Sequence, residues 1–264
     1  MTHVVRNVVE YQVRDAVRSR WLAIYTGFFL VVSEGLFRYA GSAEKAVVSL
    51  MTVVLFVVPL VTLVLGTVYL YGAREFTELL LAQPVRRGQL FAGLYLGLTL
   101  PLVAAFLGGV GISGLLHFPE LDAARGAFAT LLVVGAALTA VFTAIAFVIA
   151  LRSDDRLRGL GIGIGVWLLL SFVYDGLVLI GVAVFADYPL ERPMLALTFA
   201  NPIDLGRVLL LLRLDVSALM GYTGAVFQRF FGGPFGVLAA GLALAAWIAA
   251  PVALGARSFA RRDF

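Results

Sequence analysis

The stretch Val47–Tyr71, VVSLMTVVLFVVPLVTLVLGTVYLY, contains no aspartate, glutamate, lysine or arginine. A helix needs about 20 consecutive apolar residues to cross the hydrocarbon core of a bilayer. This stretch is long enough, and its apolar residues show no polar face that would be turned to water. It therefore predicts a transmembrane helix.

Five further stretches have the same character, and together with the first they predict an all-α polytopic membrane protein with six transmembrane helices. They are Trp21–Phe37, Gln89–Leu116, Ala127–Leu151, Leu160–Phe185 and Pro234–Gly255. The alternative is a set of buried helices in one large soluble core. So little charge lies between the six stretches that this alternative is disfavoured.

The composition supports a membrane protein. Hydrophobic residues make up 61% of the 264 residues and charged residues only 14%, whereas soluble domains carry about 25% charged residues. Too few charges remain to cover a surface that faces water. An ordinary soluble enzyme, a disordered chain and a nucleic-acid-binding module are therefore excluded.

The chain lacks the residues for several kinds of chemistry. It has no cysteine, which excludes disulfides, thiolate metal sites and cysteine nucleophiles. Its one lysine, Lys45, lies in Ser42-Ala43-Glu44-Lys45, which is not the glycine-rich loop of an ATP-binding site. We therefore expect no catalytic residue, no resident cofactor and no ATPase site in this chain.

The basic residues predict the orientation. One side, formed by the N-terminus, loops 72–88 and 152–159 and the C-terminus, carries 13 of the 20 basic residues. Four of the other seven lie in a single long loop, 186–233. Because short loops rich in arginine stay in the cytoplasm, both termini are expected to be cytoplasmic in the cell membrane.

Two regions outside the spans show helical patterns of their own. Residues 4–20 form an amphipathic pattern in which Glu10 and Arg14 are spaced to pair, typical of a helix lying on lipid, or alternatively of a solvated tail. In the long loop, Asn201-Pro202-Ile203-Asp204 predicts the start of a helix over about 202–213. A second candidate runs from Asp215 to before Gly232. Both helices are expected to be re-entrant or surface-lying, with ordinary capped surface helices as the alternative.

The loop from Arg74 to Leu90, REFTELLLAQPVRRGQL, predicts a short helix that begins with acidic residues and ends at Pro84. The leucines of this helix must be buried against lipid headgroups or in a groove on a partner protein. A plain interfacial loop is the remaining alternative.

Three groups of residues resemble ABC-2-type transporter permeases, and in particular those that serve the maturation of nitrous oxide reductase. They are Leu79-Leu80-Leu81 through Pro84 with Arg87-Gly88-Gln89; Val166-Trp167 through Phe172-Val173 with Asp175; and Asn201-Pro202, Asp204 and Arg207. The groups lie in the expected order, and the resemblance covers nearly the whole chain. One departure is Glu75-Phe76, where that family usually has a Gly-Thr pair.

The resemblance implies partners and roles. It implies one permease domain over 1–264, made of an interfacial helix (1–20), five transmembrane helices (21–185), an external loop (186–233), a sixth helix (234–256) and a tail (257–264). It implies a homodimer on two copies of a separate ATPase. Contacts with that ATPase would come from a coupling helix and from the second cytoplasmic loop. The implied residues are Glu75, Glu78, Leu79, Leu80, Pro84, Arg86 and Arg87 in the first, and Asp154, Asp155 and Arg156 in the second.

Outside the membrane, the resemblance implies that Asn201, Asp204 and Arg207 contact an extracytoplasmic partner protein and that the cargo is a copper or sulfur species. The second loop has simple positive-inside anchoring as its alternative. Two rival functions stay open for the whole chain: an ABC-2 exporter of a lipid, drug or peptide, and a membrane scaffold without transport.

Asp175 is the polar residue that stands out within a span. Counted from Leu160 at 1.5 Å per residue, it lies about 22 Å along the helix, in the outer half of the bilayer. A carboxylate there is costly and marks a candidate functional site. Four interpretations remain open: lining a transport path, pairing with Arg207 or Arg213, a neutral acid, and a structural hydrogen bond.

Two weaker patterns carry no site. His117, Met51, Met194 and Met220 are too scattered for a metal. Gly111-Ile112-Ser113-Gly114 has no histidine placed to activate the serine, so it is interpreted as a small-residue surface for helix packing.

Overall fold

In the computed structural model the described residues, 2–82, 85–185, 188, 190–214, 230 and 233–262, form helices and no strands. Six helices are long and apolar enough to cross a membrane. The all-α fold with six spans is therefore confirmed, and the chain is a multi-pass membrane protein. The spanning helices are α2 (Arg20–Tyr39), α3 (Ala43–Gly72), α5 (Arg87–Leu116), α6 (Arg125–Arg152), the continuous helix that begins with α7 (Arg156–Leu168), and α12 (Pro234–Arg261).

The remaining described elements are short or lie at the ends of the spans. They are α1 (Thr2–Arg18), α4 (Arg74–Leu81), the 3₁₀ turn η1 (Asp122–Ala124), the π-helical segment η2 (Leu169–Val173), α8 (Tyr174–Val184), α9 (Glu191–Ala200) and α10 (Pro202–Arg213). The fifth span thus consists of α7, η2 and α8 in one run.

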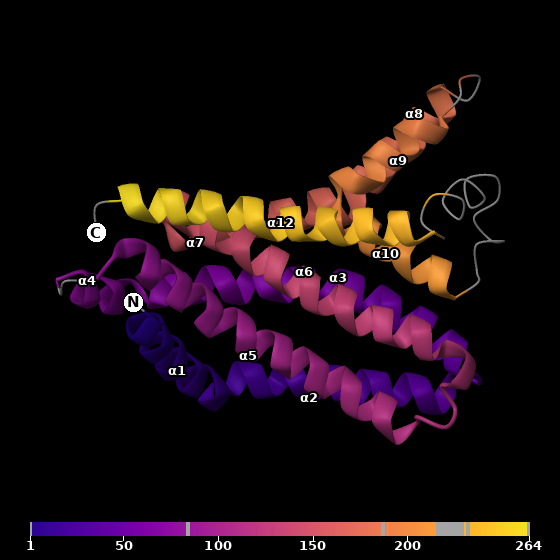
Figure 1. The fold of residues 1–264 in the computed structure, drawn as a ribbon, viewed down its shortest axis with the longest axis horizontal. Coiled ribbons are helices and arrows are strands. Elements are labelled where there is room, and N and C mark those ends of the chain that lie inside the picture. The colour runs from indigo at the N-terminus through magenta and orange to yellow at the C-terminus, as the bar shows by residue number, and fades with distance from the viewer. Residues whose placement is uncertain are drawn as a thin grey trace.

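The core of the bundle lies between α3, α5 and α6, with α2 against α5 and α12 against α6 (Figure 1). Small residues allow the helices to approach closely. This is usual in membranes, where the hydrophobic effect does not drive helices together and association depends on tight packing. Gly135 lies under the ring of Phe106, and a Cβ added to Gly135 would lie 2.2 Å from that ring. A Cβ added to Gly66 would lie 2.7 Å from Ala146.

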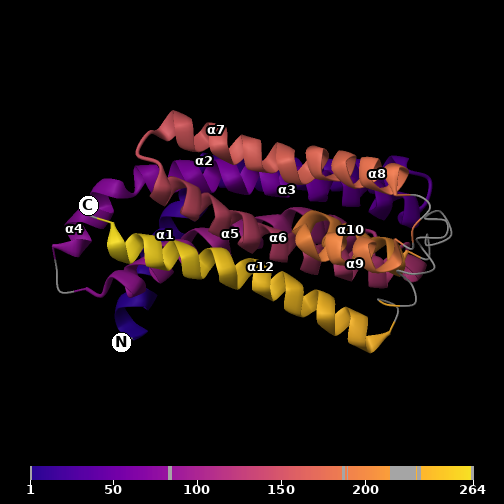
Figure 2. The ribbon, with the colours of Figure 1, turned by 90° about the horizontal axis from the view of Figure 1, so that it is seen from above.

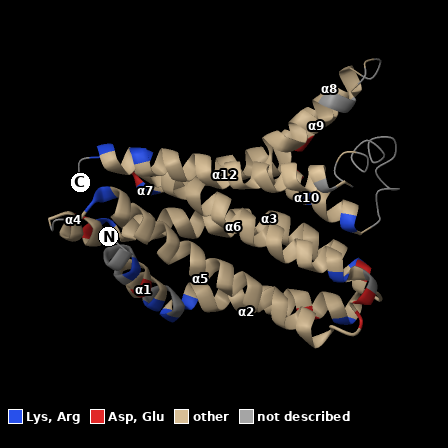
Figure 3. Ribbon diagram, in the orientation of Figure 1, with Lys and Arg blue, Asp and Glu red and all other residues tan. Residues whose placement is uncertain are grey.

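Both termini lie at one end of the bundle, next to α4, and we call this the terminal end (Figure 1). Charged residues gather at the two ends of the bundle and leave the middle largely uncharged (Figure 3). This is the distribution expected of helices that cross a hydrocarbon layer.

The N-terminal helix α1 forms as the periodicity of residues 4–20 predicts, and Arg14 pairs with Glu10 at 3.3 Å. One side of α1 is buried against protein. Val8 and Gln12 lie over Gly93 and Gly97 of α5, where an added Cβ would come within 2.7 Å and 2.5 Å of them. Part of its apolar face thus serves packing on the bundle, and its place relative to lipid stays a prediction.

Between the fifth and sixth spans, α9 and α10 form a hairpin bent by 114°. The helix predicted over 202–213 is confirmed: Asn201 accepts a hydrogen bond from the Ile203 amide at 3.0 Å, and Pro202 occupies the first turn. Helix α9 was not predicted. The second candidate, from Asp215, lies outside the described residues except for Phe230. We call the end of the bundle next to this loop the hairpin end.

The hairpin is partly inside the bundle. Leu205 and Leu210 of α10 are fully buried, and α10 packs on α6, α9, α12 and α3. Figure 2 shows α9 and α10 between α8 on one side and α12 on the other, while α8 and α9 lean away from the bundle in Figure 1. Helix α10 is therefore not an isolated surface helix, and whether it is re-entrant stays a prediction.

Candidate functional site

The short helix α4 presents one face to the bundle and one to the outside. Thr77 is buried and Phe76 stacks on Tyr11 of α1, with ring centroids 5.5 Å apart. Leu79 on the other face is 71% exposed. An exposed leucine at the end of a membrane bundle suits contact with a partner protein or with lipid.

The other residues predicted to contact the ATPase differ in how far their side chains are exposed. Glu75 and Glu78 are exposed, with Glu78 lying 3.4 Å from Arg74. Leu80 is partly buried and packs on the core. Pro84 lies outside the described residues. Arg86 precedes α5 and is exposed.

Arg87 is already engaged within the chain. Its Nη1 donates to the carbonyl oxygens of Ala260 at 3.0 Å and Arg262 at 2.7 Å, at the end of α12. Arg87 therefore has a structural role within the chain, in addition to any contact with another subunit.

The second predicted contact, residues 154–156, lies at the same end. Asp155 caps α7 by accepting a hydrogen bond from the Leu157 amide at 2.8 Å. Asp154 pairs with Arg262. Tyr71, at the end of α3, donates to the carbonyl oxygens of Ser153 at 2.8 Å and Asp155 at 3.1 Å. Arg156 begins α7 and is exposed.

Near the hairpin end, the structure brings all four remaining predicted residues into one polar cluster. Arg207 donates to Asp175 at 2.7 Å, and its Nη1 lies 2.9 Å from an oxygen of Asp204. Asn201 donates to Asp204 at 3.1 Å and to the Leu170 carbonyl in η2 at 2.8 Å. The predicted pairing of Asp175 with Arg207, rather than with Arg213, is therefore the one observed.

This cluster borders a cavity of about 420 Å³ between α8, α9 and α10. Asp175, Asp204 and Arg207 supply its polar groups, and Val178, Leu179, Leu197 and Val208 supply apolar walls. Tyr174 closes one side by donating to the Leu197 carbonyl at 2.7 Å. A few convergent polar groups among apolar side chains are typical of binding pockets.

A model of the ABC-2 family transporter proteins matches residues 6–264. The chain belongs to this family. It is an ABC transporter permease. Two curated relatives are both described as probable ABC transporter permease protein NosY. The one from Pseudomonas aeruginosa is 31% identical over 276 aligned positions, and the one from Stutzerimonas stutzeri is 29% identical over 278, each covering 98% of both chains.

The motif residues of this ABC-2 permease that lie within the fifth span have a structural role. Trp167 donates from its ring nitrogen to the Phe56 carbonyl of α3 at 3.0 Å, and Phe172 packs against both Trp167 and Phe56. Trp167 thus holds the fifth span to α3 just before η2, and Phe172 does so within η2. Asp175 follows shortly after η2 in the chain.

Asn201, Asp204 and Arg207 were predicted to contact an extracytoplasmic partner. Asn201 has no exposed surface, and the Asp204 and Arg207 side chains are 15% and 28% exposed. Within the chain these residues hold α10 to η2 and α8. Their contact with a partner stays a prediction.

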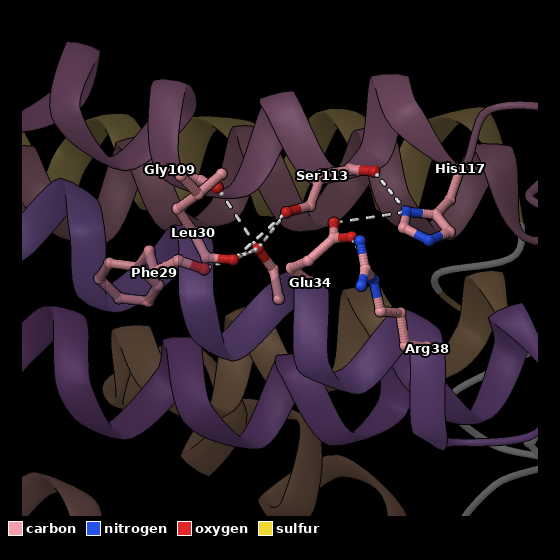
Figure 4. Close-up of polar contacts among 8 residues, drawn as sticks. Phe29, Leu30, Glu34, Arg38, Gly109, Ser113 and His117 are labelled. Atoms are coloured by element: carbon pink, nitrogen blue, oxygen red, sulfur yellow. Dashed lines mark hydrogen bonds and ion pairs between the residues drawn. The ribbon is translucent and has the colours of Figure 1, made fainter.

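Within the pattern Gly111-Ile112-Ser113-Gly114, Ser113 faces α2 (Figure 4), and a Cβ added to Gly114 would lie 2.2 Å from the Phe128 ring. Ser33 of α2 donates to Ser113 of α5 at 2.9 Å and approaches the Gly109 carbonyl at 3.3 Å. Beside them Glu34 pairs with Arg38 at 2.6 Å and lies 3.7 Å from His117. His117 thus takes part in a polar network near the hairpin end of α2 and α5.

No group of three or more histidine, aspartate or glutamate residues that could hold a metal occurs in the described ranges. Two residues that hold the terminal end together were not predicted. Tyr71 and Arg262 link the terminal ends of four helices. The one signal in the sequence was the position of Arg262 among the arginines that follow the sixth span, since arginines near a helix end can bond its last carbonyl groups.

Proposed function

We propose that this permease couples ATP hydrolysis by a separate ATPase subunit to movement of its outer hairpin, with the terminal end in the cytoplasm. The observation that supports this most is Leu79: an exposed leucine on a short helix that is itself braced against α1 and α3. A surface that transmits movement from an ATPase must contact that ATPase and pass the movement on to the other helices.

Displacement of α4 has short routes into the bundle. Only Ala73 separates α4 from α3, and the stack of Phe76 on Tyr11 connects α4 to α1. Because packed helices shift as rigid elements, a push on α4 moves α3 and α1 together. Two copies of the permease on two ATPase subunits complete the proposed assembly.

At the hairpin end, the fifth span and the hairpin are joined by Asn201 and Arg207. A change in the tilt of α7 therefore reaches α10 through η2. We propose that this movement serves delivery of a copper or sulfur species, with an extracytoplasmic partner, during nitrous oxide reductase maturation. The similarity to the two NosY permeases supports this part.

Co-purification tests the coupling. The permease is expressed with the ATPase subunit of the same transporter, and Leu79→Ser should reduce ATPase recovery while the wild-type chain retains it. Leu116→Ser is the matched control, because Leu116 is also exposed, at 67%, but lies at the opposite end of the bundle. Equal recovery with Leu79→Ser and wild type would contradict the coupling surface.

Gene deletion in a host that contains nitrous oxide reductase tests the cargo. Loss of the permease should leave that enzyme without its metal centre, and the wild-type gene should restore it. An unaffected reductase alongside a bound ATPase would favour an exporter of a lipid, drug or peptide. Absence of any ATPase from the purified wild-type protein would favour a scaffold.

A further inference from the structure

The ends of α5, α6 and α12 meet at the terminal end, where two arginines connect them. The last carbonyl groups of an α-helix have no partner within the helix and must be satisfied from outside. At the end of α12, Arg87 from the first turn of α5 does this for Ala260 and Arg262.

Arg262 does the same for α6. Its Nη1 donates to the carbonyl oxygens of Ala150 at 3.0 Å and Leu151 at 2.8 Å, in the last turn of α6. Its Nη2 bonds Asp154 in the following loop. The Arg262 side chain is only 14% exposed, although it is the last described residue of the chain.

The geometry requires an arginine. The planar guanidinium presents several donors in a fixed fork, so one group reaches two carbonyls and a carboxylate together. A lysine ammonium at the same place is a point charge on a flexible stem and cannot reproduce this fork. The positive charge also lies at the negative end of α6.

The contacts run in a continuous series. The start of α5 follows α4, Arg87 joins α5 to the end of α12, and Arg262 joins the end of α12 to α6 and to loop 153–155. Tyr71 holds the same loop from the end of α3. The two regions predicted to meet the ATPase, separated by about 70 residues in the chain, are thereby bridged by the C-terminal end.

We propose that Arg262 is a positioning residue that, with Arg87, locks the two ATPase-facing regions, α4 and loop 153–155, into one rigid body. A displacement of α4 then also moves α6 and α7. This inference rests on the proposed coupling function and extends it to the C-terminal end of α12. Without the clamp formed by these two arginines, only the Tyr71 hydrogen bonds described above connect loop 153–155 to the helices that move with α4, and the loop follows α4 less closely.

The test measures the distance between the two regions. Because the chain has no cysteine, Gly88→Cys and Leu157→Cys give one pair of spin labels, at exposed positions beside the clamp. The wild-type complex with its ATPase should give the same narrow distance distribution without nucleotide and in the vanadate-trapped state. Arg262→Gln should broaden the distribution in the trapped state.

A second readout separates positioning from simple stability. ATP turnover of the Arg262→Gln complex should fall at least about fivefold, the lower end of typical coupling between sites, with ATPase recovery and melting temperature unchanged. Arg261→Gln is the matched control, because it removes the same charge from the neighbouring exposed position. It should leave both readouts as in the wild type.

A narrow trapped-state distribution and unchanged turnover in Arg262→Gln would overturn the clamp while leaving the coupling function intact. If Arg262→Gln fails to fold, Arg262→Lys keeps the charge without the fork, and the same broadening is required of it. Failure of the wild-type permease to recover the ATPase would instead count against the proposed function. In that case the label pair is measured in the permease alone, where a distribution that is no broader in Arg262→Gln than in the wild type would show that Arg262 does not join the two regions.

Discussion

At the scale of single residues, Arg207 connects two helices near the hairpin end of the bundle. It lies between Asp175 and Asp204, which come from different helices. Two carboxylates in a largely apolar setting repel one another unless a cation separates them. The residue therefore sets the spacing of α8 and α10.

Arg207→Gln should lower the free energy of unfolding by about 1–3 kcal/mol, less than for a fully buried pair because the groups are partly exposed. Thermal unfolding in detergent measures it. Arg213→Gln, at an exposed position of the same helix, should change stability by less than about 0.5 kcal/mol. Adding Asp175→Asn to Arg207→Gln should recover part of the loss, and no recovery would argue against their pairing.

Gly109 is the residue that permits the contact of α2 with α5. A Cβ there would lie 2.7 Å from the Thr26 carbonyl oxygen and 2.8 Å from the Phe29 Cβ, whereas a Cβ on Gly108 would meet nothing within 4 Å.

Gly109→Ala should destabilise the bundle by about 1–3 kcal/mol, since backbone atoms of α2 would have to move. Gly108→Ala is the control and should be neutral or stabilising by up to about 1 kcal/mol, because alanine favours the helix. Melting temperatures of the two variants in one detergent give the comparison, and equal values would contradict this packing of α2 on α5.

At the scale of elements, the hairpin of α9 and α10 depends on Asn201. This residue caps α10 with its side-chain oxygen and holds η2 with its side-chain nitrogen. The π-helical turn leaves the Leu170 carbonyl available for this contact, and such turns often occur at functional positions.

Two substitutions at Asn201 separate these roles. Asn201→Ser keeps a capping oxygen but loses the bonds to Leu170 and Asp204. Asn201→Ala loses the capping oxygen as well as these bonds. The alanine variant should be less stable than the serine variant by about 1 kcal/mol, the usual worth of a cap. Hydrogen exchange of the α10 amides follows the cap, and equal protection in the two variants would show that the cap adds nothing.

At the scale of the whole molecule, the distribution of basic residues between the two ends predicts how the bundle lies in the membrane. Most of them lie at the terminal end with α4 and loop 152–159. This asymmetry predicts that the terminal end lies in the cytoplasm.

Single cysteines in this cysteine-free chain test the orientation in intact cells. Leu157→Cys, 78% exposed at the terminal end, should react with a membrane-impermeant maleimide only after the cells are opened. Tyr39→Cys, 86% exposed at the other end, should react from outside. The reverse pattern would mean that both termini are external.

The sequence by itself determined the helical spans, the amphipathic first helix, the capped helix at Asn201 and the short helix before Pro84. These follow from local properties: apolar length, helical periodicity and capping residues act within one element. The resemblance in three short motifs likewise depended only on residues that lie close together in the chain.

Tertiary structure alone decided which elements meet. Asp175 selected Arg207 over Arg213, Asn201 turned inward to η2, and Arg262 reached α6 across more than 100 residues. Local periodicity cannot predict such contacts, because they depend on the crossing of packed helices and on which helix end leaves carbonyl groups unsatisfied. The π-helical turn at η2 is of the same kind, since the apolar sequence of the span favours a regular α-helix throughout.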